Sequence, residues 1–144
     1  MRVIIFSLLL LIVACQSEEF VSQKNPLPDF MIGSFSDDYD ITYSISDSLF
    51  SMGSTTIIHI LEWDTEKQFF IGQNDSSNTY DPLQFSRIEW IELSEMEPFT
   101  WAFCMSAYNA PSADSARATT TTNPKSPKTG CNGYPYSRMK PISN

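Results

Sequence analysis

The chain has 144 residues, of which 42% are apolar, 13% aromatic and 18% charged, and nine Lys and Arg stand against seventeen Asp and Glu for a formal net charge of −8. This length fits one domain, and the apolar and aromatic content is too high for a disordered chain. The acidic balance, without any cluster of Lys and Arg, argues against a nucleic-acid partner.

Residues 1–14 have the pattern of an export signal. Arg2 supplies a positive charge, and residues 3–13 are apolar except for Ser7. This run is shorter than the about 20 residues that a transmembrane helix needs, and it ends at the small residue Ala14 before an abrupt change to polar sequence. A signal peptide is therefore favoured over a buried strand or a core helix.

The four residues that end this run, Ile12, Val13, Ala14 and Cys15, resemble the lipobox of bacterial lipoproteins. In that family the signal is cut just before the cysteine, whose thiol is diacylated and whose new amino group is usually acylated as well. The resemblance implies lipidation of Cys15 as the first mature residue, and Gln16 resembles the residue found in lipoproteins that are sent to the outer membrane. Several acyl chains give the stable anchoring that one chain cannot. We therefore expect a lipid-anchored protein of the cell envelope, on the outer membrane and facing the periplasm.

Lipidation of Cys15 leaves an even pair of cysteines, Cys104 and Cys131, in an oxidising compartment. A disulfide between them is the favoured interpretation. Closing a loop of this length contributes roughly 3–4 kcal/mol to stability. The alternative is two reduced thiols that are buried separately.

The mature chain divides into three parts. Residues 15–29 are mostly polar, contain Pro26 and Pro28 near their end and lack any periodicity, which predicts a lipidated tether. Residues 30–139 are expected to form a single β-rich domain, and residues 140–144 a frayed tail.

Short runs with strand composition recur between turn signals in the body of the chain. They are residues 40–46, 57–63, 68–73, 85–93 and 99–108. Residues 112–118 offer the one credible helix, with Ser112 as its N-cap. The pattern predicts a mainly β fold, an antiparallel meander closed into a small barrel or packed as a sandwich, with one short helix in the C-terminal half.

The last predicted strand relates the cysteines to the core. Trp101 and Phe103 share one of its faces, and Cys104 lies on the other. If the aromatic face is core, the sulfur points outward, where the segment 130–136 is expected to cover it.

Three tryptophans, Trp63, Trp90 and Trp101, lie in predicted strands. Aromatic residues at this spacing usually fill a core, and the alternative is that they line a cavity for an apolar or flat ligand. We take them as candidate ligand-binding residues.

Catalytic and metal-binding motifs are missing from the sequence. His59 is the single histidine, which excludes a zinc site built on several histidines, and no G-x-S-x-G elbow surrounds any serine. Asp37, Asp38 and Asp40 lack the ligand spacing of an EF-hand loop, and Glu89 lies where a strand carboxylate is ordinarily solvated. We expect a non-enzymatic domain without a metal or other cofactor.

Two functions agree with these observations. The first is an envelope lipoprotein domain that binds a small apolar or aromatic ligand inside a barrel. The second is an acidic interaction module for a cationic envelope protein, such as an inhibitor of a cationic hydrolase, suggested by the net charge of −8.

Overall fold

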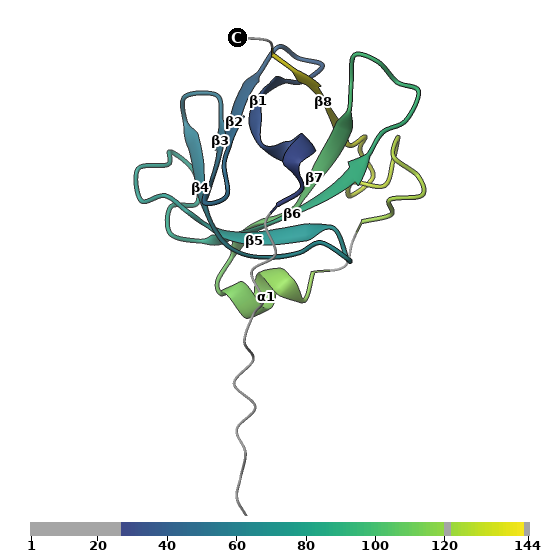
Figure 1. Cartoon of the computed structure of the whole chain (residues 1–144). Helices are drawn as coiled ribbons and strands as arrows, with labels where there is room; N and C mark the ends of the chain where they lie inside the picture. The colour runs from purple at the N-terminus through teal and green to yellow at the C-terminus, as the bar shows by residue number, and fades with distance from the viewer. Residues whose placement is uncertain (1–26, 120–121, 143–144) are drawn as a thin grey trace, which may run out of the picture.

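The computed structural model describes residues 27–119 and 122–142. They form eight antiparallel strands that follow one another around a closed barrel, in which the last strand pairs with the first (Figure 1). The elements are η1 (Asp29–Met31), β1 (Gly33–Ser36), β2 (Thr42–Ile45), β3 (Leu49–Met52), β4 (Thr56–Asp64), β5 (Phe69–Asn74), β6 (Phe85–Glu92), β7 (Trp101–Ala110), α1 (Ala113–Arg117) and β8 (Ser137–Pro141). The structure confirms the mainly β prediction and decides for a barrel over a sandwich. The predicted signal and Cys15 lie outside the described residues.

The inward face of β4 follows strand alternation with one shift. Ile58 and Ile60 are 0% and 6% exposed. The pairing of β4 with β5 changes register between Ile60 and Glu62, and this bulge moves the alternation by one residue, so that Trp63 is buried. On β5, a Cβ added to Gly72 would lie 2.3 Å from Cγ2 of Ile58, so the two strands approach closely only because this residue is glycine.

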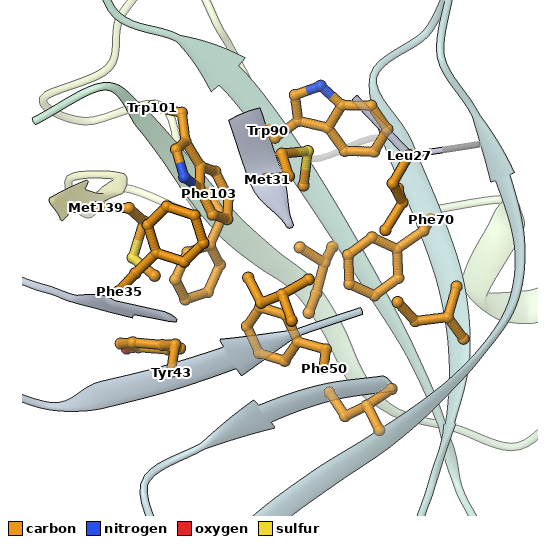
Figure 2. Packing of buried hydrophobic residues seen from close by; sticks show 14 of the residues in the cluster. Leu27, Met31, Phe35, Tyr43, Phe50, Phe70, Trp90, Trp101, Phe103 and Met139 are labelled. Atoms are coloured by element: carbon orange, nitrogen blue, oxygen red, sulfur yellow. The ribbon is translucent and has the colours of Figure 1, made fainter. Parts of the chain in front are cut away.

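Aromatic side chains fill the barrel interior (Figure 2). The Phe50 ring lies 5.8 Å from the Tyr43 ring and 5.5 Å from the Phe103 ring, measured between centroids. Trp101 meets Phe35 edge-on at 5.4 Å. Such tilted and edge-to-face contacts are the favoured arrangements of aromatic pairs, and they make the interior a packed core.

The segment before β1 is part of that core. Leu27 and Met31 are 1% and 0% exposed and belong to the same cluster as Trp90. Figure 1 shows η1, in purple, within the ring of strands. The expected tether boundary at residue 29 is therefore wrong, because the apolar side chains of this segment are buried inside the barrel.

The C-terminal residues complete the barrel. Lys140 pairs with Ser36 of β1, and Met139 is 0% exposed. The backbone N–H of Ile142 donates to the carbonyl of Ser34 on β1. The prediction of a frayed tail from residue 140 is therefore wrong for residues 140–142, because strand β8 is needed to close the sheet.

The predicted helix is confirmed as α1. The Oγ of Ser112 accepts a backbone hydrogen bond from the first turn, as expected of an N-cap. Ala116 is 0% exposed and packs with Phe69 and Ile71 of β5. Helix α1 therefore covers the outer face of β5, and this strand is buried on both sides.

Candidate functional site

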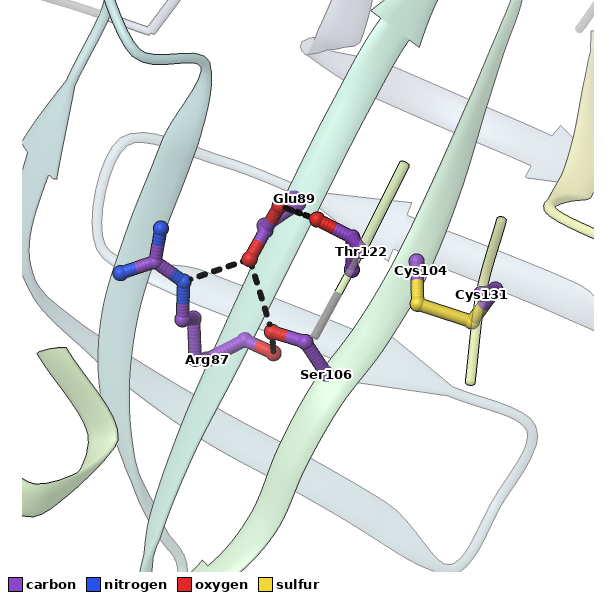
Figure 3. The surroundings of a disulfide bond; sticks show 6 residues. All are labelled: Arg87, Glu89, Cys104, Ser106, Thr122 and Cys131. Atoms are coloured by element: carbon purple, nitrogen blue, oxygen red, sulfur yellow. Dashed lines mark hydrogen bonds and ion pairs between the residues drawn. A yellow bond between two sulfur atoms is a disulfide. The ribbon is translucent and has the colours of Figure 1, made fainter. Parts of the chain in front are cut away.

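The predicted disulfide is confirmed. Cys104 on β7 is bonded to Cys131, and their Cα atoms are 5.4 Å apart (Figure 3). We call the segment before β8, residues 122–136, the strap. Tyr136 of the strap is 3% exposed and packs with Cys104 and Ala102 on the outer face of β7. The prediction that Cys104 lies opposite the aromatic core face, under a covering segment, is confirmed as well.

The strap is compact in itself. The N–H of Asn123 donates to the carbonyl of Gly130 at 2.8 Å, and the N–H of Tyr136 donates to the carbonyl of Pro127 at 2.8 Å. A Cβ added to Gly130 would lie 2.0 Å from the carbonyl oxygen of Asn123, so a glycine is required for this close approach. The strap is therefore held in one defined conformation by its own backbone contacts.

A buried polar network lies beneath the start of the strap. Glu89 accepts hydrogen bonds from Nε of Arg87 at 2.7 Å, from Oγ of Ser106 at 3.1 Å and from the hydroxyl of Thr122 (Figure 3). The guanidinium of Arg87 stacks 3.8 Å above the centroid of the Phe69 ring. Both oxygens of the carboxylate are thus used within the protein, which is the arrangement of a structural network.

Sequence reasoning missed this role of Glu89. Its side chain is only 12% exposed, because α1 and the strap cover the outer face of β6. The expectation of a solvated strand carboxylate is therefore wrong. Strand alternation shows that the residue points out of the barrel, but it contains no information on what covers that face.

Above the outer face of β6 lies a pocket of about 480 Å³, which we call the outer groove. The apolar part of its lining consists of Ile91, Leu93, Met96, Pro124 and Pro127. One wall is therefore the end of β6 with the following connection, and the other wall is the strap. The lining is mixed, since Gln68, Glu92, Ser94 and Lys125 also contribute.

Charged groups flank the outer groove unequally. Glu92, Glu95 and Glu97 lie on the β6–β7 side, are exposed, and form no ion pair among the described residues. Lys125 and Lys128 lie on the strap side and are likewise exposed and unpaired within the described part of the chain. Of these five residues only Glu92 and Lys125 line the groove itself, and the two segments that form it carry three glutamates against two lysines.

The three candidate tryptophans lie elsewhere. Trp63, Trp90 and Trp101 are 8%, 2% and 0% exposed and all belong to the core cluster. Figure 2 shows Trp90 and Trp101 among the packed side chains. A side chain that lines a cavity wide enough for water keeps accessible surface. Within the described residues the indoles therefore pack against other core side chains, and none of the three lines the outer groove.

His59 makes a hydrogen bond to Asp75 at the surface. Its Nε2 lies 2.6 Å from Oδ2 of Asp75, and the hydroxyl of Ser77 donates to the other carboxylate oxygen at 2.6 Å. The hydrogen bonds from His59 and then Ser77 lower the pKa of Asp75 below its usual range. The serine bonds to the aspartate rather than to the histidine, which is not the order of a nucleophilic triad.

Comparisons with known proteins give no match from which a function could be inferred. The chain matches no protein-family model, and neither the curated proteins nor the solved structures give a significant match. Among the described residues no helix has the length and apolar character to cross a bilayer. Within the same residues, His, Cys, Asp and Glu side chains do not gather in groups that could hold a metal ion.

Proposed function

We propose that this protein is a lipid-anchored, non-enzymatic binding domain of a bacterial cell envelope, on the outer membrane and facing the periplasm. Acyl groups on Cys15 hold it at the membrane, and the outer groove receives an apolar or aromatic group of its ligand. The observation that carries the binding role is the groove itself, which combines an apolar lining with a few polar groups.

The outer groove supports this role better than the barrel interior does. Ligand pockets bury most of a small ligand against apolar side chains. In the interior, Phe50, Trp101 and Met139 are 0% exposed, and a ligand would have to displace them. In the groove, Leu93 is only partly buried and Met96 is 40% exposed, so both side chains are available for contact.

The arrangement of polar groups supports binding rather than catalysis. Glu89 is committed to Arg87 and to two hydroxyl groups, and Asp75 is committed to His59 and Ser77. A catalytic acid or base needs a site beside it in which a reacting atom fits. The outer groove offers glutamate and lysine side chains at its edges, which suits orientation of a charged ligand.

Anchoring is tested on the full chain expressed in a Gram-negative bacterium. The intact mass should correspond to a chain that starts at Cys15 and carries acyl groups, and the protein should fractionate with membranes. The variant Cys15→Ser should lack the added mass and leave the membrane fraction. A chain in the envelope that still starts at Met1 and carries no lipid would overturn the anchoring proposal.

Groove binding is tested with phenylnaphthylamine, a neutral apolar probe that fluoresces more strongly when it leaves water. The variant Leu93→Gln should weaken binding of the probe by on the order of tenfold, because it removes apolar contact area from the groove. Leu61→Gln is the matched control, since Leu61 is 51% exposed on β4 and outside the groove lining. Equal binding by all three proteins would overturn the groove as the binding site.

A further inference from the structure

We infer that the outer groove docks an extended polypeptide segment that carries both apolar and cationic side chains. This inference rests on the proposed function, because it names the partner of the same site. Its apolar side chains would lie on Ile91 and Leu93, and its cationic side chains would lie near the glutamates at the end of β6 and in the connection that follows it.

Charge complementarity selects this occupant. Most basic side chains of the domain are already used, since Arg138 pairs with Asp38 and Lys140 lies 3.6 Å from Asp40. Two of the acidic residues between Ser36 and Thr42, Asp38 and Asp40, are thereby compensated by β8. In the part of the chain that the structure describes, no ion pair compensates the glutamates of the connection between β6 and β7.

The excess of acidic residues beside the groove is visible in the local sequence. Glu92, Glu95 and Glu97 are interspersed with Leu93, Ser94 and Met96, and of the three glutamates Glu92 lines the groove together with these three residues. Apolar contact surface and unpaired negative charge therefore occur together in one short stretch. A segment that alternates apolar and basic residues presents the complementary pattern.

The positive charges of the strap offset the negative charge of the glutamates only in part. Lys125 lines the groove, and Lys128 follows it on the strap. The two segments that form the groove carry two lysines against three glutamates, and the chain as a whole carries a charge of −8. Long-range attraction therefore favours a cationic segment over an anionic one, and it weakens as salt is added.

The experiment measures fluorescence anisotropy of a labelled, amidated peptide that alternates lysine and leucine. The variant with Glu92→Gln, Glu95→Gln and Glu97→Gln should bind it on the order of tenfold more weakly at low salt, because three exposed charge contacts are lost. This difference should shrink at high salt.

The matched control removes three acidic charges elsewhere, by Asp29→Asn, Asp47→Asn and Glu66→Gln. These residues are exposed, form no ion pair among the described residues, and lie outside the groove lining. The control should bind within about twofold of the wild type. Equal losses in the two triple variants would mean that only net charge matters and would overturn the inference.

Two further measurements separate the alternatives. The variant Lys125→Gln should bind the peptide as well as or better than the wild type, whereas weaker binding would indicate an anionic or zwitterionic ligand and overturn the inference. Phenylnaphthylamine should bind all these charge variants alike. Binding of the probe without binding of the peptide would refute the cationic segment and leave the groove as a site, and failure of both would refute the proposed function too.

Discussion

Arg87 and Glu89, two residues apart on β6, form an ion pair on the outer face of the barrel, and both side chains are almost completely shielded from water. Their side chains are 9% and 12% exposed, with 2.7 Å between Nε and Oε1. Charges are expensive to remove from water, so each of them is retained only because the other is present. The pair also connects the barrel to its coverings, since Arg87 donates to the carbonyl of Arg117 and Glu89 accepts from Thr122.

Breaking this pair on one side should be more harmful than removing both charges. Glu89→Leu leaves Arg87 buried without its carboxylate and should lower the free energy of unfolding by about 3–5 kcal/mol. The double variant Arg87→Met with Glu89→Leu should lose much less, because no buried charge remains. Urea unfolding measures both. A double variant as unstable as the single one would show that the charges themselves hold the strap.

Removing the disulfide should destabilise the domain as a whole. Cys104 and Cys131 close a loop with a sequence separation of 27, and loss of the bond should lower the free energy of unfolding by roughly 3–4 kcal/mol. Urea unfolding of the oxidised protein, of the reduced protein and of the variant Cys104→Ala with Cys131→Ala measures this. Thiol titration of the denatured, unreduced protein should find neither cysteine free; two reactive thiols would contradict the bond.

Strand β8 should be needed for closure of the barrel. A chain that stops after Met139 loses both residue pairs between β1 and β8, and we expect it to be less stable by at least about 2 kcal/mol. A chain that stops after Ile142 keeps both pairs and should match the wild type. Thermal unfolding of the two truncated proteins decides, and equal stability would mean that β8 contributes nothing beyond Met139.

The hydrogen bond between His59 and Asp75 should make the free energy of unfolding depend on pH in the acid range. A carboxyl group whose pKa is lowered by folding stabilises the protein above its unfolded pKa, about 3.9, and loses this contribution as the pH falls toward its folded pKa. Wild type and Asp75→Asn should therefore differ most above about pH 4 and converge in stronger acid. Urea unfolding across this range measures the difference, and parallel curves would contradict the prediction.

The long strands were predictable because their composition and alternation extend over many residues. The predicted runs at 57–63, 68–73, 85–93 and 99–108 correspond to β4, β5, β6 and β7. Even there, one bulge decided that Trp63 of β4, and not Glu62, is the buried residue. Alternation cannot show such a shift, because it depends on the partner strand.

The short strands were missed. β1, β3 and β8 each have four or five residues and include serine, glycine or charged residues, so that no face is defined over several repeats. They form strands because the neighbouring strands offer unpaired backbone groups, which is a property of the closed sheet. Leu27 was assigned to a tether for a related reason, since its polar surroundings conceal one deeply buried side chain.

The candidate site shows the same limit. The cysteine pair was predictable from counting, whereas the outer groove arises from two segments, 91–96 and 124–127, that only the fold brings together. The tryptophans stood out in the sequence, but none of them lines the outer groove. Aromatic content indicates how much core is available, and it does not distinguish a filled barrel from a hollow one.

The burial of η1 has a mechanical consequence. A force applied through the N-terminal segment reaches the barrel at Leu27 and Met31, in the middle of the hydrophobic core. Tension at this end would have to draw these two apolar side chains into water before any strand is peeled away, at a cost of about 1.5–3 kcal/mol for each of them. An affinity tag that replaces the residues up to 26 leaves this attachment intact, whereas a fusion that begins at Ile32 removes it.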